Sequence, residues 1–353
     1  MKLRLDKLTN GAILILIIIA SLIFLKSILV PFVLAVIAWL IVVEVRTAIG
    51  GLLNSKQNKI PIWFQNIMAS IAIFAFIFIE VKVLGVSIQN LSESMVKYDD
   101  NLLLIEDQIN KFFNIDLTPH LNKMVGDFNF TTLLKNVLSS ITGLFGNTFT
   151  IVLYMIFLLF EEAAFGKKIE QIYPDKVEYN NAMQMITRIG KTVSGYLTLK
   201  TLVSLLTGGL SYVVLLIMGV EAPFFWASII IYLNFIPTIG SLIATLFPAF
   251  FTIIQFADFS AGLIVLFAVG TIQVIVGNII EPRIMGNTLN ISGLVVLLAL
   301  SFWGAIWGVW GMILSVPITV LMIIIFAEFD STRAVAIILS ENGIVDTKKK
   351  EDC

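Results

Sequence analysis

Long apolar stretches, separated by short polar connections, dominate the chain. A membrane-spanning helix needs about 20 apolar residues to cross a hydrocarbon core of roughly 30 Å. The pattern therefore predicts an all-α, polytopic membrane protein with about eight membrane segments. The apolar stretches cover residues 11–25, 28–43, 61–84, 141–160, 195–219, 222–256, 261–280 and 291–326.

The first two stretches are too long for a single crossing. Together they would form one helix of roughly 50 Å at about 1.5 Å per residue, and Lys26 and Pro31 interrupt the apolar run. We therefore predict a tight hairpin of two short helices. Basic residues precede residue 11, as in a signal peptide, but no small-residue cleavage site follows, so the first helix is expected to remain as a span.

The stretches at 222–256 and 291–326 are longer than one crossing needs, and each is broken internally. They either cross the membrane or re-enter it as helical hairpins. Irregular backbone at membrane depth is tolerated only where it lines a cavity or is buried in protein. Broken helices of this kind are where transporters place their binding sites.

The polar segment at 85–140 has a different pattern. Apolar residues recur at alternating steps of four and three, which is typical of a helix that buries a narrow seam against another helix. We predict an extramembrane helical hairpin that packs either on itself or against another subunit. The seam consists of Leu91, Met95, Tyr98, Leu102, Ile105, Ile109 and Phe112.

These patterns organise the chain into consecutive parts. Three membrane segments occupy 1–84, the amphipathic hairpin occupies 85–140, and 141–194 combines a membrane segment with a polar cytoplasmic region. A transport core with broken helices follows at 195–326, and 327–353 forms a cytoplasmic tail.

Basic residues orient the chain, because cytoplasmic loops of membrane proteins carry an excess of Lys and Arg. With a cytoplasmic N-terminus and a crossing at every stretch, the inside segments hold 15 Lys and Arg residues and the outside segments hold 7. If both long stretches re-enter, Arg283 moves inside and the counts become 16 and 6. In either case both termini are expected in the cytoplasm and the 85–140 hairpin on the opposite face.

Composition agrees with a membrane protein and excludes several functions. Hydrophobic residues make up 58% and charged residues 13%, and the net charge of −1 argues against nucleic-acid binding, which needs a basic surface. The sole cysteine, Cys353, and the sole histidine, His120, cannot build a Cys- or His-based metal site. The sequence also lacks a P-loop and a zinc-protease motif. We therefore expect no enzyme activity, no metal and no cofactor.

The transport core contains only five charged residues among 132. Charged groups at membrane depth are rare and usually functional. Glu221 and Asp258 fall at predicted loop ends, where solvation explains them. Lys200 either snorkels to the interface or contributes to a transport path. Glu281 and Arg283 either pair with each other, or one of them meets a partner elsewhere in the bundle.

Glu281 and Arg283 belong to the most distinctive cluster of polar and charged residues in the chain. Pro282 disfavours helical geometry in the residue before it, so Glu281 is expected at a helix end. Asn278 adds a hydrogen-bonding amide one turn earlier, and Gly286 permits a sharp exit. This constellation is either a transport site or a solvated loop without a role.

A proline interrupts the apolar run at 222–256. Pro237 removes a backbone donor and kinks or breaks the helix, and Asn234 and Gly240 flank it. The polar groups here either bind a solute or only satisfy the freed backbone of a kinked helix. The candidate residues of the substrate path are thus Lys200, Asn234, Pro237, Gly240, Asn278, Glu281 and Arg283.

Glycine alternates with tryptophan at 301–312. Gly304 and Gly308 are small residues four apart, a spacing that lets helices approach closely. The alternative is a pocket lined by the tryptophans, and helix packing is favoured. The expected hinge or packing positions are Pro282, Gly286, Gly304, Gly308, Gly311 and Pro317.

These motifs together resemble the autoinducer-2 exporter family of bacterial membrane proteins. The matching runs are residues 194–201, 234–241, 277–286 and 293–317, and Val30-Pro31-Phe32 agrees in the N-terminal half. The resemblance implies an all-helical, multi-pass inner-membrane protein that forms a homo-oligomer. The implied substrate is a small polar furanone-type signal, or in some relatives sodium exchanged for protons. Ser292-Gly293 stands where more distant relatives have a proline-containing turn.

Three functions compete on this sequence. A secondary exporter of a small polar signal, autoinducer-2 by resemblance, leads because it accounts for the sparse charges, the broken stretches and the missing ATPase motif. A sodium/proton antiporter requires a carboxylate that titrates in the membrane, and Glu281 is the candidate. A structural or assembly protein built around the 91–112 seam is the alternative outside transport.

Overall fold

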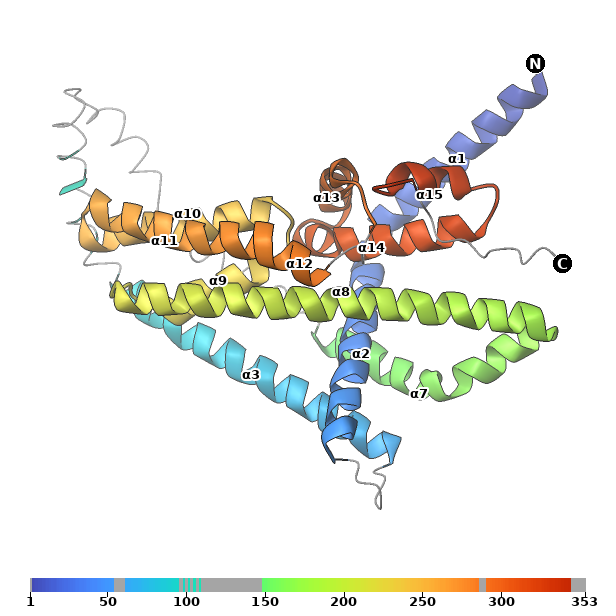
Figure 1. The fold of residues 1–353 in the computed structure, drawn as a ribbon, viewed down its shortest axis with the longest axis horizontal. Coiled ribbons are helices and arrows are strands. Elements are labelled where there is room, and N and C mark those ends of the chain that lie inside the picture. Colours follow the sequence, from blue (N-terminus) through green and yellow to red (C-terminus); the bar gives the residue numbers. More distant parts are fainter. Residues whose placement is uncertain are drawn as a thin grey trace. The chain divides into compact units, whose positions relative to one another are not determined.

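The computed structural model describes residues 2–53, 61–94, 98, 101, 104–105, 108, 148–285 and 290–343 (Figure 1). Regular structure within these ranges is helical, without strands. Among the described residues, six helices are long and apolar enough to cross a membrane, and one bent pair raises the number to seven. The chain is an all-α, multi-pass membrane protein, which confirms the fold class that the apolar pattern predicts.

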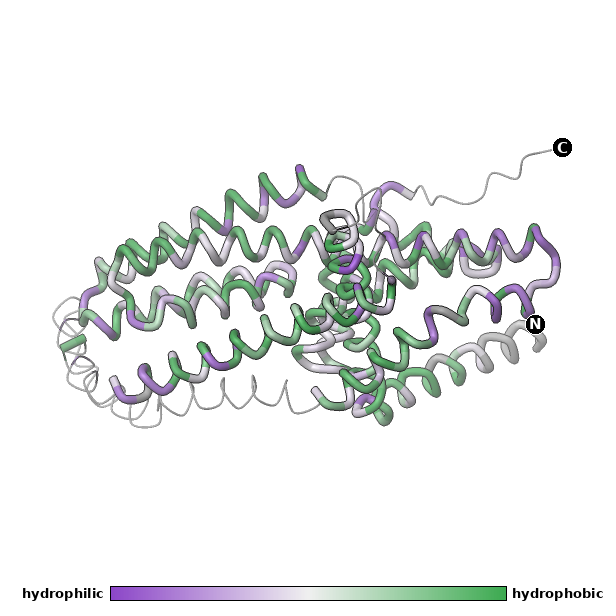
Figure 2. Tube along the Cα trace, turned by 90° about the horizontal axis from the view of Figure 1, so that it is seen from below, coloured by the Kyte–Doolittle hydropathy of each residue, from purple (hydrophilic) through white to green (hydrophobic). Residues whose placement is uncertain are grey.

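Apolar side chains cover much of the helical surface. Figure 2 shows long hydrophobic stretches of helix, and large side chains such as Phe24, Phe157 and Ile217 are exposed on them. A water-soluble protein rarely exposes contiguous apolar surface on this scale. A bilayer is the solvent that this surface fits.

The helices form two compact units. The first comprises residues 1–57, 147–196 and 287–353, and the second comprises 58–146 and 197–286. The long helix α8 (Lys176–Ile217) contributes its N-terminal part to the first unit and its C-terminal part to the second.

The first unit begins with α1 (Lys2–Phe24) and α2 (Lys26–Leu53), which meet at Leu25. The predicted tight hairpin of two short helices is wrong, because helical hydrogen bonding continues through the junction. The Leu25 N–H donates to the Ser21 carbonyl at 2.9 Å, and the Leu29 N–H donates to the Leu25 carbonyl at 2.8 Å. Pro31 lies inside α2 and does not divide it.

Helix α7 (Thr148–Ile172) packs against α2 in the same unit and bends by 65° after Glu162. The Glu162 carboxylate accepts hydrogen bonds from the Arg46 guanidinium at 2.9 Å and from the Trp39 indole at 3.3 Å. A charged group of α2 therefore meets its counter-ion at the bend of α7.

The second long apolar stretch forms a helical hairpin of α13 (Gly293–Trp307) and α14 (Val309–Glu328). Gly308 makes the turn with a φ of 64°, a conformation that favours glycine. A Cβ atom on Gly311 would stand 1.8 Å from the Trp303 carbonyl oxygen, so only glycine fits. The short helix α15 (Arg333–Leu339) brings the chain back to the start of α13, where the Ser292 N–H donates to the Leu339 carbonyl.

Side chains of this hairpin fill the core of the first unit. Trp303 and Trp307 are buried with ring centroids 5.1 Å apart, and the Trp307 indole donates to the Leu22 carbonyl of α1. Gly304 faces Met312 across the hairpin. Pro317 is buried within α14. The tryptophans thus lie in packed positions.

The second unit contains α3 (Ile62–Ser94), the C-terminal part of α8, and three further helices. These are α9 (Pro223–Leu233), α10 (Ile239–Phe256) and α11 (Phe259–Ile275). A five-residue π-helical turn (Val276–Ile280) and α12 (Glu281–Met285) continue α11. Helices α10 and α11 pack along each other (Figure 1).

The core of the second unit joins these helices to the extension of α3. Phe251 of α10 contacts the ring of Trp226 at 5.0 Å and the ring of Tyr98 at 5.8 Å. Leu91 of α3 is buried in the same cluster. The described part of the 91–112 seam therefore packs on α9 and α10, a contact that neither sequence interpretation included. Four seam residues lie outside the described residues: Met95, Leu102, Ile109 and Phe112.

Candidate functional site

The broken stretch at 222–256 folds back on itself. Helix α9 has 11 residues, and at 1.5 Å per residue it reaches about 16 Å, roughly half of a hydrocarbon core. The Gln255 side chain at the end of α10 donates to the Gly219 carbonyl at 2.8 Å and accepts from the Glu221 N–H at 2.7 Å. The end of α10 thus returns to the segment that precedes α9. We name α9, α10 and their connection the α9–α10 hairpin.

The tip of the α9–α10 hairpin carries the residues around Pro237. Asn234 is buried, and its side-chain amide donates to the Ser204 hydroxyl of α8 at 3.1 Å. Thr238 has a φ of 59°, and Pro237 just before it is partly buried. A Cβ atom on Gly240 would stand 1.8 Å from the Leu233 carbonyl oxygen. Gly240 therefore permits the close approach of the two helices at the tip.

Lys200 and Glu281 form an ion pair between α8 and α12. The Lys200 Nζ atom lies 2.5 Å from the Glu281 Oε1 atom, and the side chains are 7% and 20% exposed. Lys200 therefore does not snorkel into solvent. Glu281 finds its partner elsewhere in the bundle, which was one of the two alternatives, and Arg283 is not that partner.

The expectation that Glu281 stands at a helix end is wrong. Glu281 has helical dihedral angles (φ −56°, ψ −51°), and its N–H donates to the Val276 carbonyl five residues back. Proline clashes with the carbonyl four residues before it in a regular α-helix. The wider π-helical turn at Val276–Ile280 accommodates Pro282 without ending the helix.

The remaining candidates do not join the ion pair. Asn278 and Arg283 are exposed, and Arg283 forms no ion pair with any residue that the structure describes. Gly286 lies outside the described residues. Asp258 begins α11, where its carboxylate accepts from the Ser260 N–H at 2.8 Å. Hydrogen bonds from Ser260 hold the pKa of Asp258 below its usual value, in agreement with a solvated position at a loop end.

Helix α8 connects the hairpin tip to the ion pair. Residues four apart lie on the same face of a helix, so Ser204, which holds Asn234, follows Lys200 by one turn. The structure thus brings Lys200, Glu281 and Asn234 to neighbouring turns of one helix. Sequence reasoning missed Ser204. The signal that could have found it is a stripe of buried polar residues at steps of four, three and four: Lys200, Ser204, Thr207 and Ser211.

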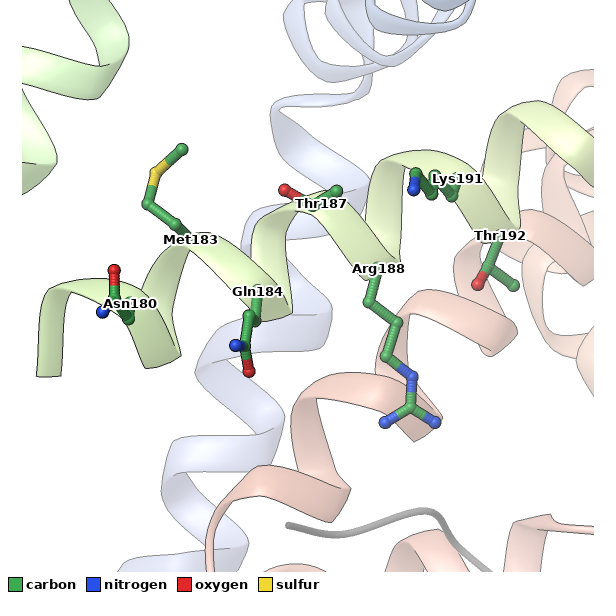
Figure 3. Close-up of a pocket in the computed structure, with 7 residues that line it drawn as sticks. All are labelled: Asn180, Met183, Gln184, Thr187, Arg188, Lys191 and Thr192. Carbon is green, nitrogen blue, oxygen red and sulfur yellow. The ribbon is translucent and has the colours of Figure 1, made fainter. Parts of the chain in front are cut away.

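A surface hollow of about 480 Å³ lies elsewhere, along the N-terminal part of α8 (Figure 3). It contains none of the candidate residues, and one face of one helix supplies its lining. No group of three or more His, Cys, Asp or Glu residues that could hold a metal ion occurs within the described ranges. The hollow is lined by Asn180, Met183, Gln184, Thr187, Arg188, Lys191 and Thr192.

Comparison with known proteins identifies the family of the chain. The model of the AI-2E family of transporters matches residues 12–330, which is most of the chain. The chain belongs to the AI-2E transporter family. The AI-2 transport protein TqsA of Escherichia coli K12 is 37% identical over 210 residues, which cover 60% of each chain.

Two further relatives match over longer ranges. A putative transport protein of Haemophilus influenzae is 29% identical over 349 residues, covering 96% of this chain and 97% of the relative. The putative transport protein YhhT of Escherichia coli K12 is 32% identical over 273 residues, covering 74% of each chain. Membership of the AI-2E family supports a role in transport rather than in catalysis.

Proposed function

We propose that this chain is a secondary transporter that exports a small polar signalling molecule of the autoinducer-2 type. The substrate class is suggested by the likeness to TqsA, which is named an AI-2 transport protein. In this proposal the protein resides in the bacterial inner membrane with both termini in the cytoplasm, and works as a homo-oligomer. The basic-residue asymmetry of the sequence supports the orientation.

The buried ion pair of Lys200 and Glu281 is the observation that carries the proposal. A charged group at membrane depth costs about 2.5–3.5 kcal/mol on the insertion scale, so a chain keeps such groups where they serve a purpose. The pair lies next to the tip of a broken helical hairpin, where Asn234 offers amide hydrogen bonds. Hydroxyl and carbonyl groups of a small polar solute match these donors and acceptors. We assign the substrate path to this region, with Pro237 and Gly240 shaping the tip.

Sodium/proton antiport is the second candidate function. Glu281 favours it, because a carboxylate within the membrane segments can alternate between a proton and a metal cation. Lys200 would then occupy the cation position in one state. Sodium/proton exchange differs from export of a signalling molecule in what is transported. Both functions would use the ion pair of Lys200 and Glu281.

A flux assay with purified protein in liposomes tests the two candidates. Uptake of autoinducer-2 and of sodium is measured separately under imposed proton gradients, for wild type, Glu281→Gln and Lys200→Gln. Glu170→Gln is the matched control, because Glu170 is exposed on α7. We expect Glu281→Gln to reach the membrane and lose flux, and Glu170→Gln to transport normally.

The outcomes separate the alternatives. Normal flux per folded molecule in both Glu281→Gln and Lys200→Gln would end the assignment of the site. Absence of both fluxes in the wild-type protein would contradict transport of either cargo. A structural or assembly role then becomes the better explanation, since that role predicts that Glu281 can be changed without effect.

A further inference from the structure

The base of the α9–α10 hairpin has a strained backbone on both sides. Ala222 precedes α9 with a φ of 51°, and Ala257 follows α10 with a φ of 50°. Non-glycine residues adopt this left-handed conformation at an energetic cost, and they keep it only where the surrounding structure imposes it. Some contact must therefore hold the base in place.

That contact comes from two residues that follow α3 in the chain, Asn101 and Gln108. The last carbonyl groups of a helix have no partner within the helix. Here the Asn101 side-chain amide donates to the Ile254 carbonyl at 3.1 Å and to the Gln255 carbonyl at 2.8 Å. The Gln108 side chain donates to the Ala257 carbonyl at 3.0 Å. Two amide side chains thus satisfy the end of α10 and its strained cap.

Tyr98 anchors the same stretch by apolar contact. Its ring packs edge-on against Phe251 of α10. Burial, reinforced by the neighbouring Glu221 carboxylate, raises the pKa of Tyr98. Tyr98, Asn101 and Gln108 all contact α10 or the residue that follows it. We name the described residues Tyr98, Asn101, Leu104, Ile105 and Gln108 the arm.

We propose that the arm is a releasable clamp on the α9–α10 hairpin, and that Asn101 positions the hairpin tip by holding its base. Helix α10 links the base to the tip over 18 residues, about 27 Å at 1.5 Å per residue. Release of the arm lets Ala257 leave its strained conformation and frees the hairpin to move as a unit. The inference rests on the proposed function only in that the moving tip belongs to the substrate path.

The chain offers a matched control for Asn101. Gln89 lies on α3, and its amide donates to Glu93 of the same helix at 3.1 Å. Gln89→Ala therefore removes an amide that does not reach the hairpin, whereas Asn101→Ala removes the two donors at its base. Gln108→Ala removes only the outer hydrogen bond, and provides a milder variant where Asn101→Ala fails to fold.

Hydrogen–deuterium exchange in nanodiscs, read by mass spectrometry, tests the clamp without reference to any substrate. In Asn101→Ala we expect exchange about tenfold faster both at the base, in residues 250–258, and at the tip, in residues 234–241, as for the loss of one or two hydrogen bonds. Gln108→Ala should show the same pattern with smaller changes, and Gln89→Ala should match wild type.

Faster exchange confined to the base would overturn the proposal, because Asn101 would then be a local helix cap. Unchanged exchange in both regions would overturn it as well. A liposome assay with autoinducer-2 on the same samples tests the proposed export separately from the clamp. If the wild type carries no flux while the exchange pattern appears, the clamp stands and the proposed export fails.

Discussion

A buried ion pair makes each of its members dependent on the other. Removing one partner leaves an uncompensated charge and costs about 3–5 kcal/mol, whereas replacing both by apolar residues of similar size is often neutral or stabilising. Lys200 is almost fully buried, and Glu281 is one-fifth exposed (20%). Their exchange for methionine therefore separates a structural from a functional role.

We expect Lys200→Met and Glu281→Met each to lower the yield of folded protein, and the double variant to recover it. All three should lack flux, because the polar part of the path is gone. Yield is measured by fluorescence-detected gel filtration and flux in liposomes. A double variant that both folds and transports would show that the pair serves stability alone.

Gly240 provides a second test at the residue scale. Alanine at this position would place its Cβ atom 1.8 Å from the Leu233 carbonyl oxygen, so the hairpin tip would have to open. We expect Gly240→Ala to lower the thermal midpoint strongly. Gly209→Ala is the control, because no atom lies within 4 Å of a Cβ atom there and alanine in a helix interior gains about 0.5–1 kcal/mol over glycine. Equal midpoints for the two variants would contradict the packing at the tip.

The sequence identified the charged residues of the site, but it did not identify the residues with which they interact. Lys200 and Glu281 stand out because charges are rare among the apolar residues of 195–326. Their pairing joins positions 81 residues apart, and no periodicity of a single segment carries that information. The contact of Asn234 with Ser204 was missed for the same reason.

At the scale of elements, the spacing of apolar residues predicts which face of a helix is buried, but it does not predict which element covers that face. The four-three spacing of the 91–112 seam indicates a packed face, and Leu91 and Tyr98 are indeed buried. Their partner is the α9–α10 hairpin, which the pattern could not name. The internal breaks of 222–256 and 291–326 were visible as proline and glycine, and both stretches are hairpins in the structure.

The seam contact leads to an element-scale prediction. Leu91 is 1% exposed, whereas Leu104 of the arm is 55% exposed. Truncation of a buried leucine to alanine removes about 2–5 kcal/mol of stability, so Leu91→Ala should lower the thermal midpoint while Leu104→Ala leaves it nearly unchanged. Thermal unfolding in detergent, followed by tryptophan fluorescence, measures both. Equal effects would mean that the seam is not packed on the hairpin.

At the scale of the whole molecule, the apolar character of the helices follows from hydropathy, whereas orientation rests on charge. The 15-to-7 asymmetry of basic residues predicts cytoplasmic termini and an 85–140 segment on the opposite face. The prediction for the first crossing was wrong because Lys26 and Pro31 indicated a turn. A proline removes one backbone donor from a helix, and α2 continues through Pro31 without that hydrogen bond.

Orientation is tested with a membrane-impermeant maleimide on intact cells. Cys353 is the sole native cysteine, and we expect it to react only after the cells are permeabilised. A second cysteine introduced by Asn114→Cys should react from outside in a Cys353→Ser background. Labelling of Cys353 in intact cells would show that the orientation is the opposite of the predicted one.

The π-helical turn at Val276–Ile280 also has a consequence at the level of the gene. Such a turn holds one residue more than the α-helix it interrupts, so it is equivalent to a single-codon insertion upstream of Glu281. Loss of one codon within the turn would restore regular winding and leave Glu281 on nearly the same side of the helix, because four α-helical residues turn through about the same angle as the five residues of the wider turn. Loss of one codon in the regular helix α11 would instead rotate Glu281 by about 100° around the helix axis. The carboxylate would then turn away from Lys200 although neither residue had mutated.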